Sequence, residues 1–111
     1  MPRQYKQGCV DVIALDEQFV RDNVHEAKQL FERTLCEGLP HLVIDLRHLR
    51  FIDSAGLEAL QHFDTCCRRR GGELKLAMPS RLVRNVLHLT GLDEQFTVAD
   101  DVIAAAGAFA Q

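Results

Sequence analysis

The chain has 111 residues, of which 47% are hydrophobic and 26% are charged. These values are ordinary for a globular protein, and the length predicts a single domain over residues 1–111. Its formal net charge of -3 gives no reason to expect nucleic acid as a partner. No run approaches the roughly 20 apolar residues that span a bilayer, and the first six residues lack the apolar segment of a secretory signal. We therefore expect a cytoplasmic protein without membrane insertion.

The four cysteines are irregularly spaced, at Cys9, Cys36, Cys66 and Cys67. They form no C-x-x-C pair, so neither a disulfide framework nor a zinc ribbon is indicated. His62 and Cys66 stand four residues apart on a predicted helix and could both touch a metal. Two such ligands without companions are more typical of a partly exposed helix face, so we expect no metal and no cofactor.

In chain order, apolar residues over 10–15 predict an early strand, with a short pairing strand over 3–7 and a turn at Gly8. Asn23 fits a helix N-cap, with Glu26 three residues later. Apolar residues then recur at steps of three and four, which predicts a helix to about residue 37. Gly38 and Pro40 would end this helix.

The apolar block 41–46 predicts a buried central strand, and the segment Phe51-Ile52-Asp53-Ser54-Ala55-Gly56-Leu57 follows it. Leu57, Leu60 and Phe63 recur at steps of three, as on one face of a helix. Ser54 fits the N-cap of that helix, and Gly56 would let another surface approach its first turn. A hydroxyl at the positive end of a helix is well placed to hold a phosphate. A helix start that is merely well capped is the other interpretation of the same residues.

Residues 68–70, three arginines before Gly71-Gly72, fit the last turn of this helix, where cations suit the dipole. An RNA-binding patch is the alternative, but no aromatic residues are interleaved with the arginines. Alternation over 73–78 then predicts a strand, Ser80 caps a helix that closes at Gly91, residues 96–99 form a short strand, and Asp100 or Asp101 caps a last helix.

This alternation of strands and helices predicts an α/β fold with a mixed, mostly parallel sheet of four to five strands and about four helices. Sites in such sheets gather at the carboxyl ends of the strands, and Asp53-Ser54 follows such an end.

Catalysis at Ser54 is disfavoured by the residues around it. A nucleophile elbow requires G-x-S-x-G, and Ile52 occupies the first glycine position. The histidines, His25, His41, His48, His62 and His88, show no spacing typical of a triad. Phosphate-binding glycine motifs are absent from the sequence as well, so we expect a protein that is not an enzyme.

Four segments together resemble a STAS domain of the anti-sigma-factor antagonist type, over about residues 8–109. They are Leu42-Val43-Ile44-Asp45-Leu46, the box Asp53-Ser54-Ala55-Gly56-Leu57, Gly71-Gly72-Glu73-Leu74 and Leu89-Thr90-Gly91-Leu92. The resemblance implies a bacterial regulator in which Ser54 is phosphorylated by a partner anti-sigma factor that is itself a serine kinase. The unmodified protein would bind that partner, the phosphorylated protein would release it, and a phosphatase would reset the system.

Under this hypothesis the partner-binding residues are Asp53, Ser54, Ala55, Gly56, Leu57 and Glu58, together with the segment near residues 20–23. Arg81 and Arg84 would be charges at the rim, or simply part of a solvated helix face.

The chain departs from the family pattern in two places. Relatives usually carry a G-E-[LI]-D segment where this chain has Glu17-Gln18-Phe19-Val20, and Ala55 and Glu58 replace a common Ser or Thr and a usual Gly. STAS domains also act as unphosphorylated binding modules, beside the ATPase of a lipid-transport ABC system or in signalling scaffolds. This second function remains the alternative.

Overall fold

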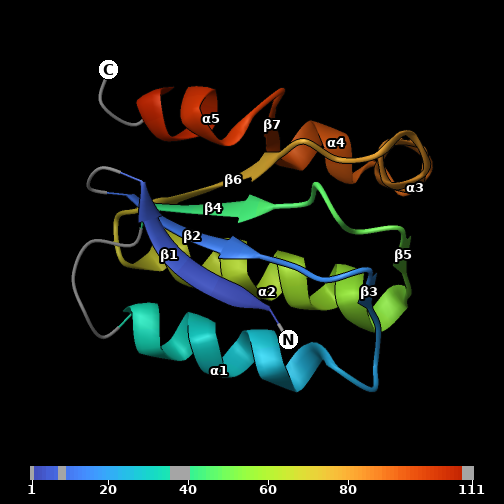
Figure 1. The fold of residues 1–111 in the computed structure, drawn as a ribbon, viewed down its shortest axis with the longest axis horizontal. Helices are drawn as coiled ribbons and strands as arrows, with labels where there is room; N and C mark the ends of the chain where they lie inside the picture. The colour runs from blue at the N-terminus through green and yellow to red at the C-terminus, as the bar shows by residue number, and fades with distance from the viewer. Residues whose placement is uncertain (1, 8–9, 36–40, 109–111) are drawn as a thin grey trace.

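The computed structural model of this chain describes residues 2–7, 10–35 and 41–108. A five-stranded sheet of order β1-β2-β4-β6-β7 is at its centre (Figure 1). The strands are β1 (Arg3–Gln7), β2 (Val10–Ala14), β4 (His41–Asp45), β6 (Glu73–Ala77) and β7 (Thr97–Ala99). β1 runs antiparallel to β2, and the other three pairings are parallel. The predicted α/β class with a mixed, mostly parallel sheet is confirmed.

Helices cover both faces of this sheet. In the described residues they are α1 (Val24–Leu35), α2 (Ser54–Arg69), α3 (Arg81–Leu89), α4 (Leu92–Gln95) and α5 (Val102–Ala108). α1 and α2 lie on one face and α5 on the other (Figure 1). The single-turn helix α4 was not predicted. The predicted turn at Gly8 and the helix stop at Gly38 and Pro40 fall outside the described residues.

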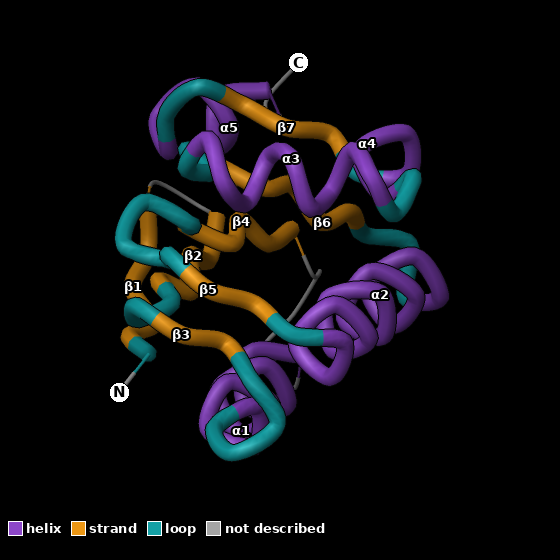
Figure 2. Tube along the Cα trace, turned by 90° about the vertical axis from the view of Figure 1, so that its right-hand side faces the viewer, coloured by secondary structure: helices purple, strands orange, loops and turns teal. Residues whose placement is uncertain are grey.

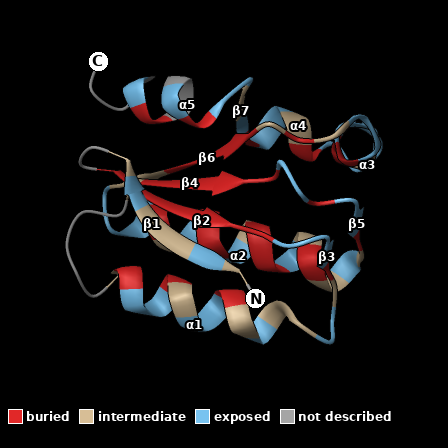
Figure 3. Cartoon of the chain, in the orientation of Figure 1, coloured by how far each residue is buried: buried red, intermediate tan, exposed pale blue. Residues whose placement is uncertain are grey.

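The sheet separates two apolar cores. On the α1–α2 side, the rings of Phe31 and Phe63 stack with their centroids 4.3 Å apart and join the two helices. On the α5 side, a smaller cluster contains Val12, Val43 and Val102. Strand β2 is consequently buried throughout, and β4 and β6 are buried except for their first residues (Figure 3), as central parallel strands require.

A second, two-stranded parallel sheet positions the loops at the carboxyl ends of β2 and β4. It consists of β3 (Gln18–Phe19) and β5 (Phe51–Ile52), side by side in Figure 2. The Asn23 side chain supports the turn after β3, because its Oδ1 accepts from the Val20 amide at 2.8 Å and its Nδ2 donates to the Gln18 carbonyl at 2.8 Å. The predicted capping of α1 by this side chain is therefore wrong: its hydrogen bonds point back along the chain.

Candidate functional site

The N-cap of α2 is Asp53, which corrects the prediction that Ser54 holds this position. Asp53 has an extended backbone (φ -105, ψ -175), and its Oδ1 accepts from the Gly56 amide at 2.9 Å. Its Oδ2 accepts from the Arg21 amide at 3.0 Å, so one carboxylate joins the start of α2 to the loop after β3. A carboxylate has two acceptor oxygens, and in Asp53 each oxygen serves one of the two amides.

These backbone donors also fix the charge of Asp53. The hydrogen bond from Arg21, followed by that from Gly56, lowers the pKa of the Asp53 carboxyl below its ordinary value of 3.8. Asp53 is thus anionic at neutral pH and occupies the position next to the helix N-terminus that suits an anion.

Ser54 is the first residue of α2, and its side chain is exposed. Because Asp53 does the capping, no described residue is hydrogen-bonded to the Ser54 hydroxyl. The oxygen lies at a helix start, outside the apolar cores. A second protein can therefore reach it without unfolding the chain.

Gly56 is buried, and what approaches it is the chain itself. A Cβ at this position would lie directly against the Phe19 carbonyl oxygen and 2.8 Å from Ile52 Cγ1. The close approach expected at Gly56 is made by β3 and β5 of the chain itself, which corrects the prediction that Gly56 contacts a partner. Gly56 is thus buried under the first turn of α2. In the same turn Glu58 is exposed, and Ala55 and Leu57 are half-buried.

The small β3–β5 sheet was missed by the sequence analysis. The Glu17 carbonyl accepts from the amides of Arg50 and Phe51, at 2.8 and 3.1 Å, and the Phe19 carbonyl accepts from the Asp53 amide at 3.4 Å. These bonds place the segment 17–21 beside the start of α2, as the hypothesis of a shared face near residues 20–23 requires. Strands of two residues carry no periodicity, so only the apolar Phe19 and Phe51-Ile52 signalled them.

Two of the three arginines at the end of α2 form contacts within the fold. Arg68 Nε lies 3.1 Å from Asp64 Oδ2, and Arg70 donates to the Leu35 carbonyl at 2.8 Å. Cys67 beside them is buried, and burial raises the pKa of its thiol to about 12. The Cys67 thiol is therefore not an activated nucleophile.

His62 and Cys66, the pair weighed as metal ligands, do lie together: the Cys66 sulfur is 3.6 Å from His62 Nε2. Among the described residues, no group of three potential ligands is positioned to hold a metal ion. Among all the residues that the structure describes, no helix has the length and apolar content needed to cross a bilayer.

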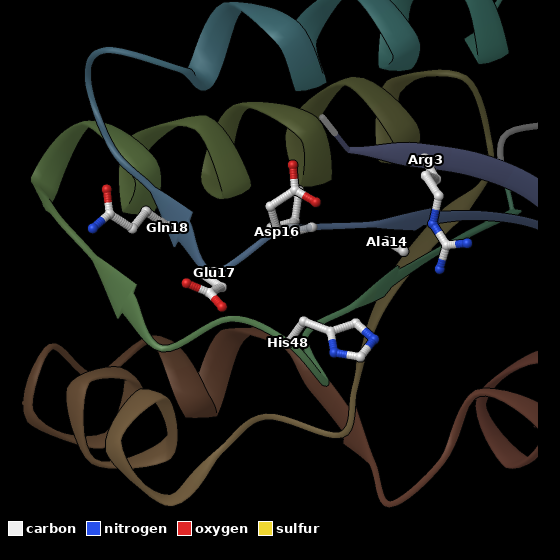
Figure 4. A pocket seen from close by; sticks show the side chains of 7 residues that line it. Arg3, Ala14, Asp16, Glu17, Gln18 and His48 are labelled. Atoms are coloured by element: carbon white, nitrogen blue, oxygen red, sulfur yellow. The ribbon is translucent and has the colours of Figure 1, made fainter.

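A hollow of about 480 Å³ lies at the carboxyl ends of β2 and β4. Its lining includes the Arg3 guanidinium, the His48 imidazole and the carboxylates Asp16 and Glu17 (Figure 4). None of the predicted site residues lines it. Since both signs of charge share the wall, the hollow favours neither an anionic nor a cationic ligand.

A family model for the STAS domain matches residues 3–105, and the chain therefore belongs to the STAS domain family. The resemblance predicted from the four sequence segments is confirmed. No curated protein sequence matches the chain.

Three solved structures show what the fold is similar to. An anti-sigma-factor antagonist (STAS) domain protein from Planctomyces limnophilus is 21% identical with a TM-score of 0.89, over 99% of this chain and 98% of that one. The Bacillus cell fate determinant SpoIIAA in its phosphorylated form is 18% identical with a TM-score of 0.75, over 97% and 99% of the two chains. A sulfate transporter family protein from Wolinella succinogenes is 25% identical with a TM-score of 0.77, over 91% and 84%. Antagonists and a transporter protein thus share this fold.

Proposed function

We propose that this chain is a regulatory binding protein similar to anti-sigma-factor antagonists, and that phosphorylation of Ser54 by a partner serine kinase switches it. The observation that carries the proposal is made at the start of α2. There Asp53 caps the helix, while the Ser54 hydroxyl is exposed and has no hydrogen bond to a described residue. The structural similarity to phosphorylated SpoIIAA supports it.

The docking surface consists of Asp53, Ser54, Ala55, Leu57 and Glu58, with Gly56 holding it against β3. A phosphate adds about -1.5 to -2 charge and three acceptor oxygens. On Ser54 it would lie beside the Asp53 carboxylate, which already occupies the favourable position at the helix start, and one turn from Glu58. The added charge raises the cost of desolvating this surface, so the modified protein releases its partner.

The proposal also includes the following features of the protein and its partners. The chain acts as a single domain in the bacterial cytoplasm, in transcription regulation, and is not itself an enzyme. The kinase is the anti-sigma factor, and a phosphatase restores Ser54. Neither nucleic acid nor a cofactor takes part.

The test is incubation of the whole chain with the candidate kinase and ATP, read by intact mass. The expected result is one added phosphate on the wild type and none on Ser54→Ala, with Thr65→Ala as a matched control that keeps the modification. Thr65 is exposed on α2, and its hydroxyl donates to the Gln61 carbonyl at 3.0 Å. Phosphate that persists on Ser54→Ala would refute the assignment.

The alternative is an unphosphorylated STAS binding module, such as an accessory subunit of a lipid-transport ABC system or a signalling scaffold. Two observations favour it: the segment Glu17–Val20 lacks the G-E-[LI]-D pattern that is usual in relatives, and the fold is also that of a sulfate transporter family protein. An unmodified Ser54 after incubation with the kinase would support the module. A neighbouring gene for an ABC ATPase, instead of a kinase-type anti-sigma factor, would do the same.

A further inference from the structure

Two adjoining hollows between the 47–52 segment and α3 form a surface that we name the β5–α3 groove. One hollow, of about 120 Å³, is lined by Arg50, Phe51, Ile52, Leu82, Val83 and Val86. The other, of about 380 Å³, is lined by Arg47, Leu49, Arg50, Ser80, Arg81 and Leu82. Arg50 and Leu82 belong to both, so the two hollows are continuous.

Large apolar side chains remain uncovered along this groove. Phe51 is 52% exposed and Leu82 is 57% exposed. On α3, Val86 and Leu89 follow Leu82 at steps of four and three, so the three side chains lie along one face of the helix. Single exposed apolar residues are ordinary, but a stripe of them beside an exposed phenylalanine is typical of an interaction surface.

The polar part of the groove is positively charged. Arg47, Arg50 and Arg81 line it, and no acidic side chain is among the described residues of its lining. Arg50 and Arg81 form no ion pair within the described residues, and Arg47 lies 3.7 Å from the Asp45 carboxylate. This local excess of cations stands out in a chain whose net charge is -3.

We propose that the β5–α3 groove binds an acidic amphipathic helix of a partner protein. A helix that projects apolar residues at i, i+3, i+4 and i+7 fits a groove whose wall has the same spacing. Carboxylates along the edges of that helix would pair with the arginine guanidiniums, whose fork matches a carboxylate. These edge charges would also set its direction and speed its association.

The charges argue against a second copy of this chain as the occupant. A symmetric contact between two copies would bring the same arginines face to face. The proposal is also independent of Ser54 modification, because the groove ends at Ile52 and its test uses the unmodified chain. Failure here would leave the phosphorylation proposal intact, and the reverse also holds.

The experiment is an NMR titration of the full ¹⁵N-labelled chain with a synthetic peptide of roughly five helical turns. The peptide carries leucines at i, i+3, i+4 and i+7 with glutamates on the flanks; a control peptide has lysines instead. We expect the acidic peptide to shift the amides of Arg50, Phe51, Leu82 and Val86. Leu82→Glu and Arg81→Glu should each weaken binding at least about tenfold.

Two matched variants leave the groove untouched. Ile103→Glu changes an apolar side chain on α5 that is 70% exposed, and Arg69→Glu reverses an exposed charge at the end of α2. Both should bind the acidic peptide within about twofold of the wild type, since neither side chain lines the groove and remote surface charges contribute little. Thermal unfolding of every variant verifies that each is folded.

Several results would overturn the proposal. They are equal affinity for the lysine peptide, shifts that map elsewhere, absence of binding at millimolar peptide, or equal binding by Leu82→Glu. Self-association of the chain that Leu82→Glu abolishes would replace the partner helix with a second copy.

Discussion

The two ends of α2 use their polar residues differently. At the C-terminal end, Arg68 pairs with Asp64, Arg70 donates to the Leu35 carbonyl, and the Gly72 amide donates to the Cys67 carbonyl at 2.8 Å. At the N-terminal end, Asp53 satisfies two amides and leaves Ser54 exposed. Charges at one end maintain the fold, whereas the other end holds one hydroxyl that the fold does not use. This contrast is the physical basis for proposing Ser54 as the site of a switch.

The largest effect is expected from Gly56→Ala, which tests whether the N-terminal end is held against β3. The new Cβ would meet the Phe19 backbone carbonyl, which cannot swing aside as a side chain can. We expect a loss of about 2–3 kcal/mol in the free energy of unfolding, measured by urea denaturation. Gly107→Ala, where a Cβ meets nothing within 4 Å, should instead gain roughly 0.5–1 kcal/mol. Equal effects of the two variants would contradict the packing at Gly56.

The C-terminal end is tested by Asp64→Ala. Asp64 is 2% exposed and accepts from Gln95 Nε2 at 3.2 Å as well as from Arg68. Losing both interactions should lower the free energy of unfolding by about 2 kcal/mol with no effect on Ser54 modification. Phosphorylation that fails in a folded Asp64→Ala variant would show that the two ends are not separate in role.

The pH dependence of the Asp53→Asn variant tests whether the Asp53 charge stabilises the N-terminal end of α2. The folded carboxyl has its pKa below 3.8, so its charge contributes stability that is complete above about pH 5 and is lost as the pH falls through the folded-state pKa. The wild type should therefore have the higher Tm at neutral pH, and the two Tm values should converge in acid. A constant difference across this range would mean that the Asp53 charge is not the stabilising feature.

The smallest change in stability is expected from Ser54→Asp. Because the hydroxyl is exposed and has no bond to a described residue, the free energy of unfolding should stay within about 0.5 kcal/mol of the wild type. Partner binding should nevertheless weaken in calorimetric titration, since the new charge lies beside Asp53. Ser54→Ala separates charge from loss of the hydroxyl and should bind like the wild type.

The sequence predicted those parts of the molecule whose signals are local. The apolar block at β4, the periodicity of α2 and the stop at Gly71 lie within a few residues of the structure that they specify. The sequence did not distinguish Asp53 from Ser54 as the cap, because both residue types favour this position, and the second amide that Asp53 accepts from, that of Arg21, is 32 residues away. β3 and β5 depend equally on pairing between distant segments. The sequence thus pointed to the start of α2, but which residue caps the helix and which is exposed could be read only from the fold.

The most direct measurement is the affinity of the partner kinase for the unmodified chain and for the chain phosphorylated on Ser54, by calorimetric titration with both proteins folded. The account predicts that phosphorylation weakens binding about 5- to 150-fold, as a coupling of 1–3 kcal/mol requires, while the Tm of the chain changes little. Equal affinities for the two forms would contradict it.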